Sequence, residues 1–249
     1  MIVDVVTKAE ARNAAREKAA AERAALAARK RRNRRVVIAA CVVGAVVVIA
    51  GVAVGIEAGA ASSAAAATTA AAAVRTADAT AAASAAAGRT TAAPWTLPTD
   101  VETAVKSAGL SMLTAEGTAL HIHQHLSISV DGKAITVPAE LGIDETAQQL
   151  SALHTHDTSG ILHVESPLQR TFHLDQAFAE WDVRLAKGAI GPYVAGKDGT
   201  RLAVFVDRKA YTGDPRSIVL KEHEDIDFVI TTDGSTPKAP AVFTWPSGY

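Results

Sequence analysis

The chain has 249 residues but only one cysteine, Cys41, which lies in an apolar run. A single cysteine excludes an intrachain disulfide, a CxxC redox pair and a zinc site built from several thiolates. Aromatic residues are also scarce, and none precedes Trp95. Since aromatic side chains contribute heavily to hydrophobic cores, we predict that the ordered core lies almost entirely after that position. The sequence shows no phosphate-binding loop and no nucleophile elbow.

Net charge is close to zero, but its distribution along the chain is uneven. Residues 1–35 hold eleven Lys/Arg and four Asp/Glu, whereas the remainder holds fourteen and twenty-two. The basic N-terminal segment contains no aromatic residue that could stack on bases, which argues against nucleic-acid binding. Its block of positive charge at residues 29–35 instead predicts attraction to anionic lipid headgroups.

A long uncharged stretch, Val36–Ile56, follows this basic block. As a helix its twenty-one residues would span about 30 Å, which is the thickness of the hydrocarbon layer of a bilayer. The positive-inside rule then places residues 1–35 in the cytoplasm as a basic tail and the rest of the chain outside. We therefore expect a single transmembrane helix that contacts lipid as an uncleaved signal anchor in the plasma membrane. A cleaved signal peptide is the alternative, but its leading and apolar segments would both be too long.

Residues 57–93 are nearly all Ala, Ser, Thr and Gly, with alanine at twenty-one of thirty-seven positions. Such a stretch has little apolar surface to bury, so burial cannot offset the entropy cost of ordering it. We predict a disordered low-complexity linker with transient helix, followed by an extracytoplasmic domain at residues 94–249.

Strand patterns outnumber helix patterns in that domain. Residues 119–130 alternate for the longest distance, and Asp131-Gly132 predicts a hairpin turn into a strand at 134–137. Because hairpins join most of the strands, we expect an α+β fold: a small, mainly antiparallel β domain with one covering amphipathic helix at 174–185. Further elements are expected as a helix at 99–108 and strands at 151–156, 161–165, 201–206, 218–220 and 226–230. For the helix, Thr99 and Glu102 predict a capping box at the start and Gly109 predicts the stop.

Histidines are absent before position 121, and six of the eight then fall within forty-five residues. Residues two apart in a strand share a face, so each alternating run gathers its imidazoles on one side. The residues concerned are His121, His123 and His125 in the first run, His154 and His156 in the second, and His163 with Glu165 after the next turn. We treat His173 and His223 as ordinary surface or hydrogen-bonding residues.

The spacing of a strand allows two such imidazoles to bind one metal ion. Cα atoms two residues apart are separated by about 6.6 Å, and metal–nitrogen bonds are about 2.0–2.1 Å long. His121 and His125 would be about 13 Å apart, which is too far for one ion. We therefore expect His123 to be shared, with one flanking histidine pointing elsewhere.

The second run predicts the rest of the ligand set. If residues 157–160 close a hairpin, His163 and Glu165 lie across the turn from His154 and His156. Asp157 is a further ligand candidate, or a carboxylate that supports an imidazole N–H. No Met or Cys lies near, so copper(I) is disfavoured. Imidazole with carboxylate suits a divalent transition metal, with Zn or Cu favoured and Fe or Mn possible.

Several motifs occur in a fixed order at these positions: LHIHQHL at 120–126, VPA at 137–139, LGI at 141–143, LHTHD at 153–157, SG at 159–160 and HVESP at 163–167. This HxHxHL … LHTHDxSGxxHVESP signature resembles an uncharacterised family of membrane-anchored actinobacterial proteins. The resemblance covers roughly residues 117–231 and implies membrane anchoring, but it brings no established activity. The family's typical Phe-Thr-Leu-Gly segment appears here as Phe172-His173-Leu174-Asp175, so the resemblance gives His173 no ligand role.

Three functions remain open from the sequence. The leading one is an extracytoplasmic module that captures or senses a divalent metal ion. The second is a metal-dependent hydrolytic or redox enzyme at the same site, in which Glu165 or Asp157 acts as the general base. The third is an envelope interaction module that uses a structural metal or a histidine-based response to pH. Histidines that make only hydrogen bonds within strands are the plainest alternative.

Overall fold

The long alternating segment forms the central strand of the sheet in the computed structural model, which describes residues 56–249. This strand, β1, runs from Leu120 to Val130 and turns at Asp131-Gly132 into β2, Lys133–Ile135, as predicted. Both turn residues have positive φ, at 48° and 75°, as the turn requires.

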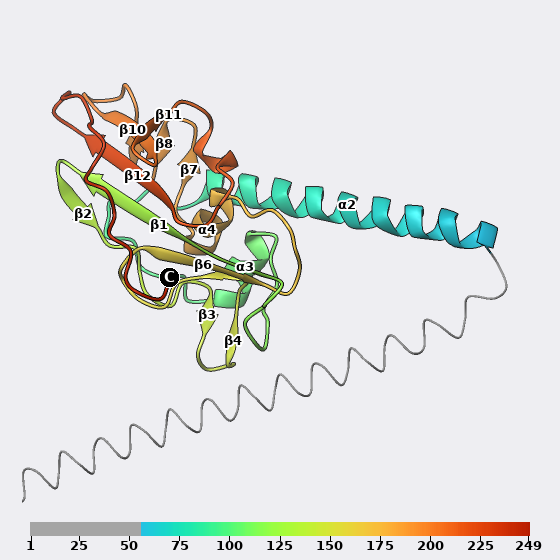
Figure 1. Cartoon of the computed structure of the whole chain (residues 1–249). Helices are drawn as coiled ribbons and strands as arrows, with labels where there is room; N and C mark the ends of the chain where they lie inside the picture. Colours follow the sequence, from blue (N-terminus) through green and yellow to red (C-terminus); the bar gives the residue numbers. More distant parts are fainter. Residues whose placement is uncertain (1–55) are drawn as a thin grey trace, which may run out of the picture. The chain divides into compact units, whose positions relative to one another are not determined.

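Seven strands form the main sheet in the order β11-β10-β12-β1-β6-β5, with β2 paired to the end of β1 (Figure 1). Only the β1–β12 pair is parallel, so the prediction of a mainly antiparallel α+β fold is confirmed. The remaining bounds are β5 Leu153–His154, β6 Ile161–Ser166, β10 Arg201–Val206, β11 Lys209–Tyr211 and β12 Glu224–Thr231.

Two smaller sheets flank this one. They consist of β3 Ile143–Asp144 with β4 Gln149–Leu150, and of β7 Leu185–Ala186, β8 Ala189–Ile190 and β9 Tyr193–Val194. The strand expected at 218–220 does not form. Val219 makes only an isolated bridge to His173, after the short 3₁₀ helix η1 at Pro215–Ser217.

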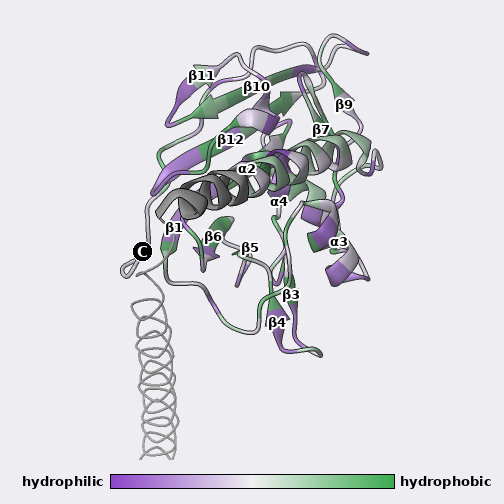
Figure 2. Cartoon of the chain, turned by 90° about the vertical axis from the view of Figure 1, so that its right-hand side faces the viewer, coloured by the Kyte–Doolittle hydropathy of each residue, from purple (hydrophilic) through white to green (hydrophobic). Residues whose placement is uncertain are grey.

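The hydrophobic core lies on the face of the sheet to which the even-numbered residues of β1 point. Leu126 and Ile128 are fully buried there. Helix α4, Leu174–Trp181, covers this face, and the rings of Phe178 in α4 and Phe228 in β12 are 5.7 Å apart. Helix α3, Val101–Ser107, lies beside α4 on the same side of the sheet (Figure 2). The odd-numbered residues of β1 point to the opposite face of the sheet.

The covering helix differs from the prediction in two respects. It ends at Trp181 because Asp182 adopts a left-handed conformation with φ 53°, so that Leu185 belongs to β7. It is also buried on all sides rather than amphipathic, because α3, β5 and η1 pack around it. Its Glu180 is consequently enclosed and accepts a 2.5 Å hydrogen bond from Ser151 Oγ.

Helix α3 begins one residue later than its predicted cap. Asp100, rather than Thr99, caps the helix by accepting a 2.9 Å hydrogen bond from the Thr103 amide. The helix ends before Gly109, whose φ of 67° matches the predicted stop.

The predicted disordered linker is instead mostly helical. Helix α2 spans Ile56–Ala87, which corrects the expectation for residues 57–93. Alanine has the highest helix propensity, and within residues 69–87 the helix gains tertiary contacts as well. Ala81 and Ala85 are fully buried, and Asp78 Oδ1 forms an ion pair with Arg170 Nη2 at 3.4 Å. Alanine can therefore pack closely where larger side chains would not fit.

No helix within residues 56–249 is long and apolar enough to cross a membrane. The predicted basic tail at 1–35 and the predicted transmembrane segment at 36–56, apart from Ile56, lie outside the described residues.

Candidate metal centre

The odd-numbered histidines of β1 lie on the face of the sheet opposite the core. They share this face because β1 alternates strictly, and its central position gives each imidazole a neighbour on an adjacent strand. In the register with β6, His121 is opposite Glu165 and His123 is opposite His163. In the register of β5 with β6, His154 is opposite His163. Three strands thus bring one set of side chains together.

Six residues form the resulting histidine cluster: His121, His123, His154, His156, His163 and Glu165. Within it, two groups of four each place one donor atom per residue within 4.8 Å of the others. The first group contains His121 and His123, the second contains His154 and His156, and both contain His163 and Glu165.

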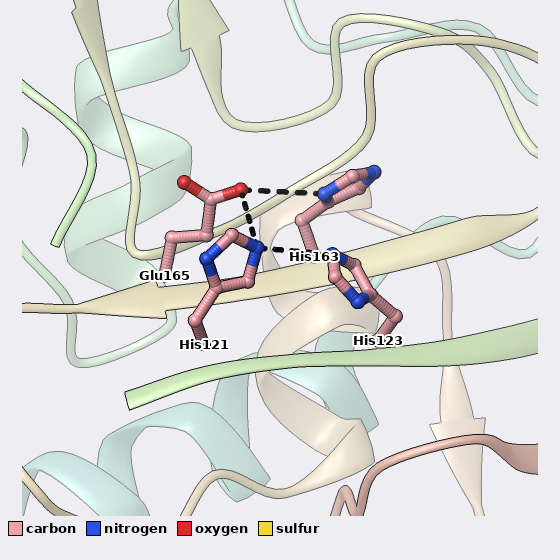
Figure 3. Close-up of side chains that lie close together, drawn as sticks. All are labelled: His121, His123, His163 and Glu165. Carbon is pink, nitrogen blue, oxygen red and sulfur yellow. Dashed lines mark hydrogen bonds and ion pairs between the residues drawn. The ribbon is translucent and has the colours of Figure 1, made fainter. Parts of the chain in front are cut away.

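The first group is centred on a carboxylate oxygen. Glu165 Oε1 lies 3.4 Å from His121 Nε2 and 3.4 Å from His163 Nδ1 (Figure 3). His121 Nε2 and His123 Nε2 are 3.1 Å apart. Two ligands of a tetrahedral ion with 2.0–2.1 Å bonds are about 3.3 Å apart, so these atoms are spaced as ligands of one ion would be.

The second group contains a histidine whose tautomer is determined by the backbone. His154 Nδ1 lies 3.0 Å from the Ser151 carbonyl oxygen, which can only accept a hydrogen bond. The neutral ring therefore carries its proton on Nδ1 and leaves the Nε2 lone pair free, 3.2 Å from His156 Nε2. Burial, followed by the charge of His156, lowers the pKa of His154 to about 4. This imidazole is thus neutral and ready to bind a metal at pH 7.

Glu165 supplies negative charge to the cluster. Burial by itself would raise the pKa of this carboxyl, but His163, His154 and His121 outweigh it and lower the pKa to about 2. Its Oε2 is buried and has no hydrogen-bond partner. The carboxylate is therefore ionised and only partly satisfied by the protein.

His123 is also tuned toward its neutral form. Burial, then the nearby His163 and His121, lowers the pKa of its imidazole. Glu222, which follows the loop after η1, lies 3.8 Å from His123 Nδ1 and favours a proton on that nitrogen. The facing nitrogen, Nε2, is then available to a ligand.

The structure places the last histidine of the first run elsewhere. His125 Nδ1 is 2.7 Å from Asp225 Oδ1, and these two residues form a third group of possible ligands with Asp227. Burial raises the pKa of Asp227, whose Oδ2 has no hydrogen-bond partner. The sequence reasoning missed both aspartates. Acidic residues at alternating positions beside Ile226 and Phe228 were the signal that could have revealed them.

Asp157 belongs to none of the three groups found within residues 56–249. Its Oδ1 instead accepts a 2.8 Å hydrogen bond from the Ser159 amide, and this interaction with Ser159 lowers the pKa of Asp157. The residue thus shapes the turn between β5 and β6.

A segment near the C-terminal end of the chain lies over the face of the sheet that carries the histidines. The sequence did not predict this covering segment. The Phe243 ring stacks on His125 with centroids 3.6 Å apart, and its amide donates to Asp225 Oδ2 at 3.3 Å. The centroid of the Tyr249 ring lies 5.0 Å from that of His123 and 5.6 Å from that of His163. Aromatic side chains therefore line part of the site.

Together these features define an α+β domain with buried histidine and carboxylate groups positioned to hold a metal ion. Comparison with protein-family models, with curated proteins and with solved structures found no match.

Proposed function

We propose that this protein is a membrane-anchored extracytoplasmic module that captures or senses a divalent transition metal ion through the histidine cluster. The observation that carries the proposal is the convergence of imidazole nitrogens and an ionised carboxylate, with nearest-neighbour separations of 3.1–3.4 Å. Purely structural histidines would be expected to pair only with carbonyls or carboxylates, whereas here imidazole nitrogens also face one another. Nitrogen and oxygen donors of this kind suit Zn or Cu best, with Fe or Mn next.

Access from solvent supports a role in binding. The His121 side chain is 50% exposed and His156 is also exposed, whereas His154, His163 and Glu165 are buried beneath them. An ion can therefore meet a rim imidazole first and then reach the buried donors. The residues after position 35 carry an excess of acidic side chains, which modestly raises the local concentration of cations.

Metal analysis of the full-length protein tests the binding proposal. Protein purified in detergent, stripped with a chelator and dialysed against Zn(II) or Cu(II) is expected to retain metal. A His123→Ala/His156→Ala variant is expected to lose most of it. His173→Asn is the matched control, because it removes an imidazole outside the cluster and keeps a residue that can cap α4. Equal metal content in the wild type and the double variant would refute the proposal.

Membrane anchoring needs its own test. Cell fractionation is expected to place the protein in the membrane fraction, and external protease is expected to cleave it after residue 56. Removal of residues 36–56 is expected to release it from the membrane. A protein that remained in the soluble fraction with those residues present would refute anchoring and leave the metal proposal intact.

A further inference from the structure

The two groups of the histidine cluster cannot both form a four-ligand site. Each group reaches four donors only by including His163 and Glu165, which the other group also requires. A single tetrahedral ion would therefore leave one of the unshared histidine pairs without a metal. The arrangement of these pairs indicates a different division of the ligands.

The unshared residues form two equivalent pairs on strands that flank β6. His121 and His123 come from β1, whereas His154 and His156 come from β5 and the residues just after it. Their Nε2 atoms are 3.1 and 3.2 Å apart, respectively. Both separations match the spacing of about 3.3 Å between two ligands of one tetrahedral ion. Each pair therefore has the geometry to hold an ion of its own.

The central residues can be divided between the two pairs. Glu165 Oε1 is 3.4 Å from His121 Nε2 and joins the first pair. The His163 ring lies 4.5 Å from the ring of His156, 4.7 Å from that of His123 and 5.4 Å from that of His154, on which it stacks. Because two of these three neighbours belong to the second pair, His163 joins the second. With its Nδ1 turned toward Glu165, His163 keeps Nε2 available. Every donor is then used once.

We propose that the histidine cluster binds two neighbouring transition metal ions. One is held by His121, His123 and Glu165, and the other by His154, His156 and His163. The proposal rests on the proposed metal-binding function and adds to it the number of ions and the ligands of each. Each ion has three protein ligands, so a coordination position remains for solvent at both.

Nearby carboxylates and access to solvent are compatible with two ions. Glu165 lies between the sets, Glu222 is 3.8 Å from His123 Nδ1, and Asp157 lies in the turn after His156. These negative charges would reduce the repulsion between two dications. Each set also has its own exposed rim imidazole, His121 or His156, through which an ion can enter.

Stoichiometric titration of the stripped full-length protein with Cu(II) tests this proposal, with electron paramagnetic resonance as the readout. We expect two equivalents to bind and the spectrum to show dipolar coupling between two close ions. The His154→Asn/His156→Asn variant is expected to bind one equivalent and to lose the coupling. The control, His125→Ala/Asp227→Asn, disrupts the third ligand group, which lies outside the histidine cluster. It is expected to bind two equivalents of Cu(II) and to keep the coupling.

The alternative outcomes separate this proposal from the one on which it rests. One equivalent in the wild type, or two equivalents without coupling, would overturn the two-ion centre but leave metal binding established. Loss of the second equivalent in the control would also overturn it, because that ion would belong to His125 and the aspartates. Absence of bound metal would overturn both proposals. The coupling in the wild type decides the matter even if the double variant fails to fold.

Discussion

His154 illustrates how a single backbone contact prepares a side chain for its role. The Ser151 carbonyl holds the proton on Nδ1, and full burial of the ring opposes a positive charge. The cost of charging this imidazole is then part of the stability of the metal-free protein. Because the pKa falls from 6.5 in the unfolded chain to about 4 in the fold, the unfolded state binds the proton more readily.

We predict that the metal-free protein loses stability as the pH falls from about 6.5 to 4, and that His154 contributes on the order of 3 kcal/mol to this loss. The contribution is absent above the unfolded pKa and reaches its full size below the folded one. Urea denaturation at pH 7, 5.5 and 4 would measure it against His154→Asn, which can still donate to Ser151. Equal pH dependence in the two proteins would contradict the assignment.

Glu222 acts on the cluster from outside the ligand groups, through His123 Nδ1. Replacing Glu222 with Gln is expected to weaken metal affinity by about tenfold or less, the lower end of the range for residues that orient a ligand. Competition with a chelating dye would measure the change. Glu145→Gln, at an exposed position away from the cluster, should leave the affinity unaltered.

At the scale of secondary-structure elements, the parallel pairing of β1 with β12 and the burial of α4 separate polar side chains on the outer face of the sheet from a polar side chain in the core. Histidines and aspartates share the outer face of the sheet, whereas Glu180 lies among core side chains beneath α4. Burial raises the pKa of Glu180 to about 8, against the lowering effect of its hydrogen bond from Ser151. The helix therefore carries a neutral carboxyl at neutral pH.

Glu180→Gln is expected to stabilise the protein at alkaline pH. Since the folded pKa lies above the unfolded one, the contribution of Glu180 is fully present below pH 4.5 and is lost as the pH rises through about 8. The neutral amide avoids this loss, so we expect a gain on the order of 4 kcal/mol at pH 8.5 and little difference at pH 4.5. The free energy of unfolding in urea at these two pH values would test it. If the variant were less stable than the wild type at pH 8.5, ionisation of Glu180 would not be the cause of the alkaline loss of stability.

For the whole molecule, the segment that carries Phe243 and Tyr249 lies against the site from a distant part of the sequence. It extends the hydrophobic shielding of an otherwise polar face. Tyr249 is 37% exposed, so the cover is partial and leaves room for an ion to exchange.

Phe243→Ala/Tyr249→Ala is expected to accelerate metal loss without changing the amount of metal bound. Each ring contact is worth about 0.5–1.5 kcal/mol, which corresponds to a change of about twofold to tenfold in the dissociation rate. Stopped-flow mixing of loaded protein with excess chelator would measure the rate. Val242→Ala, at an exposed neighbouring position, serves as the control and should dissociate at the wild-type rate.

The local pattern of residues predicted much of the fold and part of the site. Alternation along β1 and the turn signals at Asp131-Gly132 were sufficient to predict the hairpin and the shared face of the histidines. The same reasoning wrongly expected disorder at residues 57–93, since it weighed low burial more heavily than the helix propensity of alanine. It also extended α4 to Leu185, because periodicity alone does not reveal a left-handed residue such as Asp182.

The sequence by itself determined which side chains could share a face, because strand geometry requires only local alternation. It also limited the donors to nitrogen and oxygen, since residues 119–167 contain no methionine and no cysteine. Only the tertiary structure decided which histidines converge. It also decided that His125 pairs with Asp225, one hundred residues away, and that Phe243 stacks on His125. The reason is that strand order and register are set by the packing of the whole core, to which distant segments contribute together.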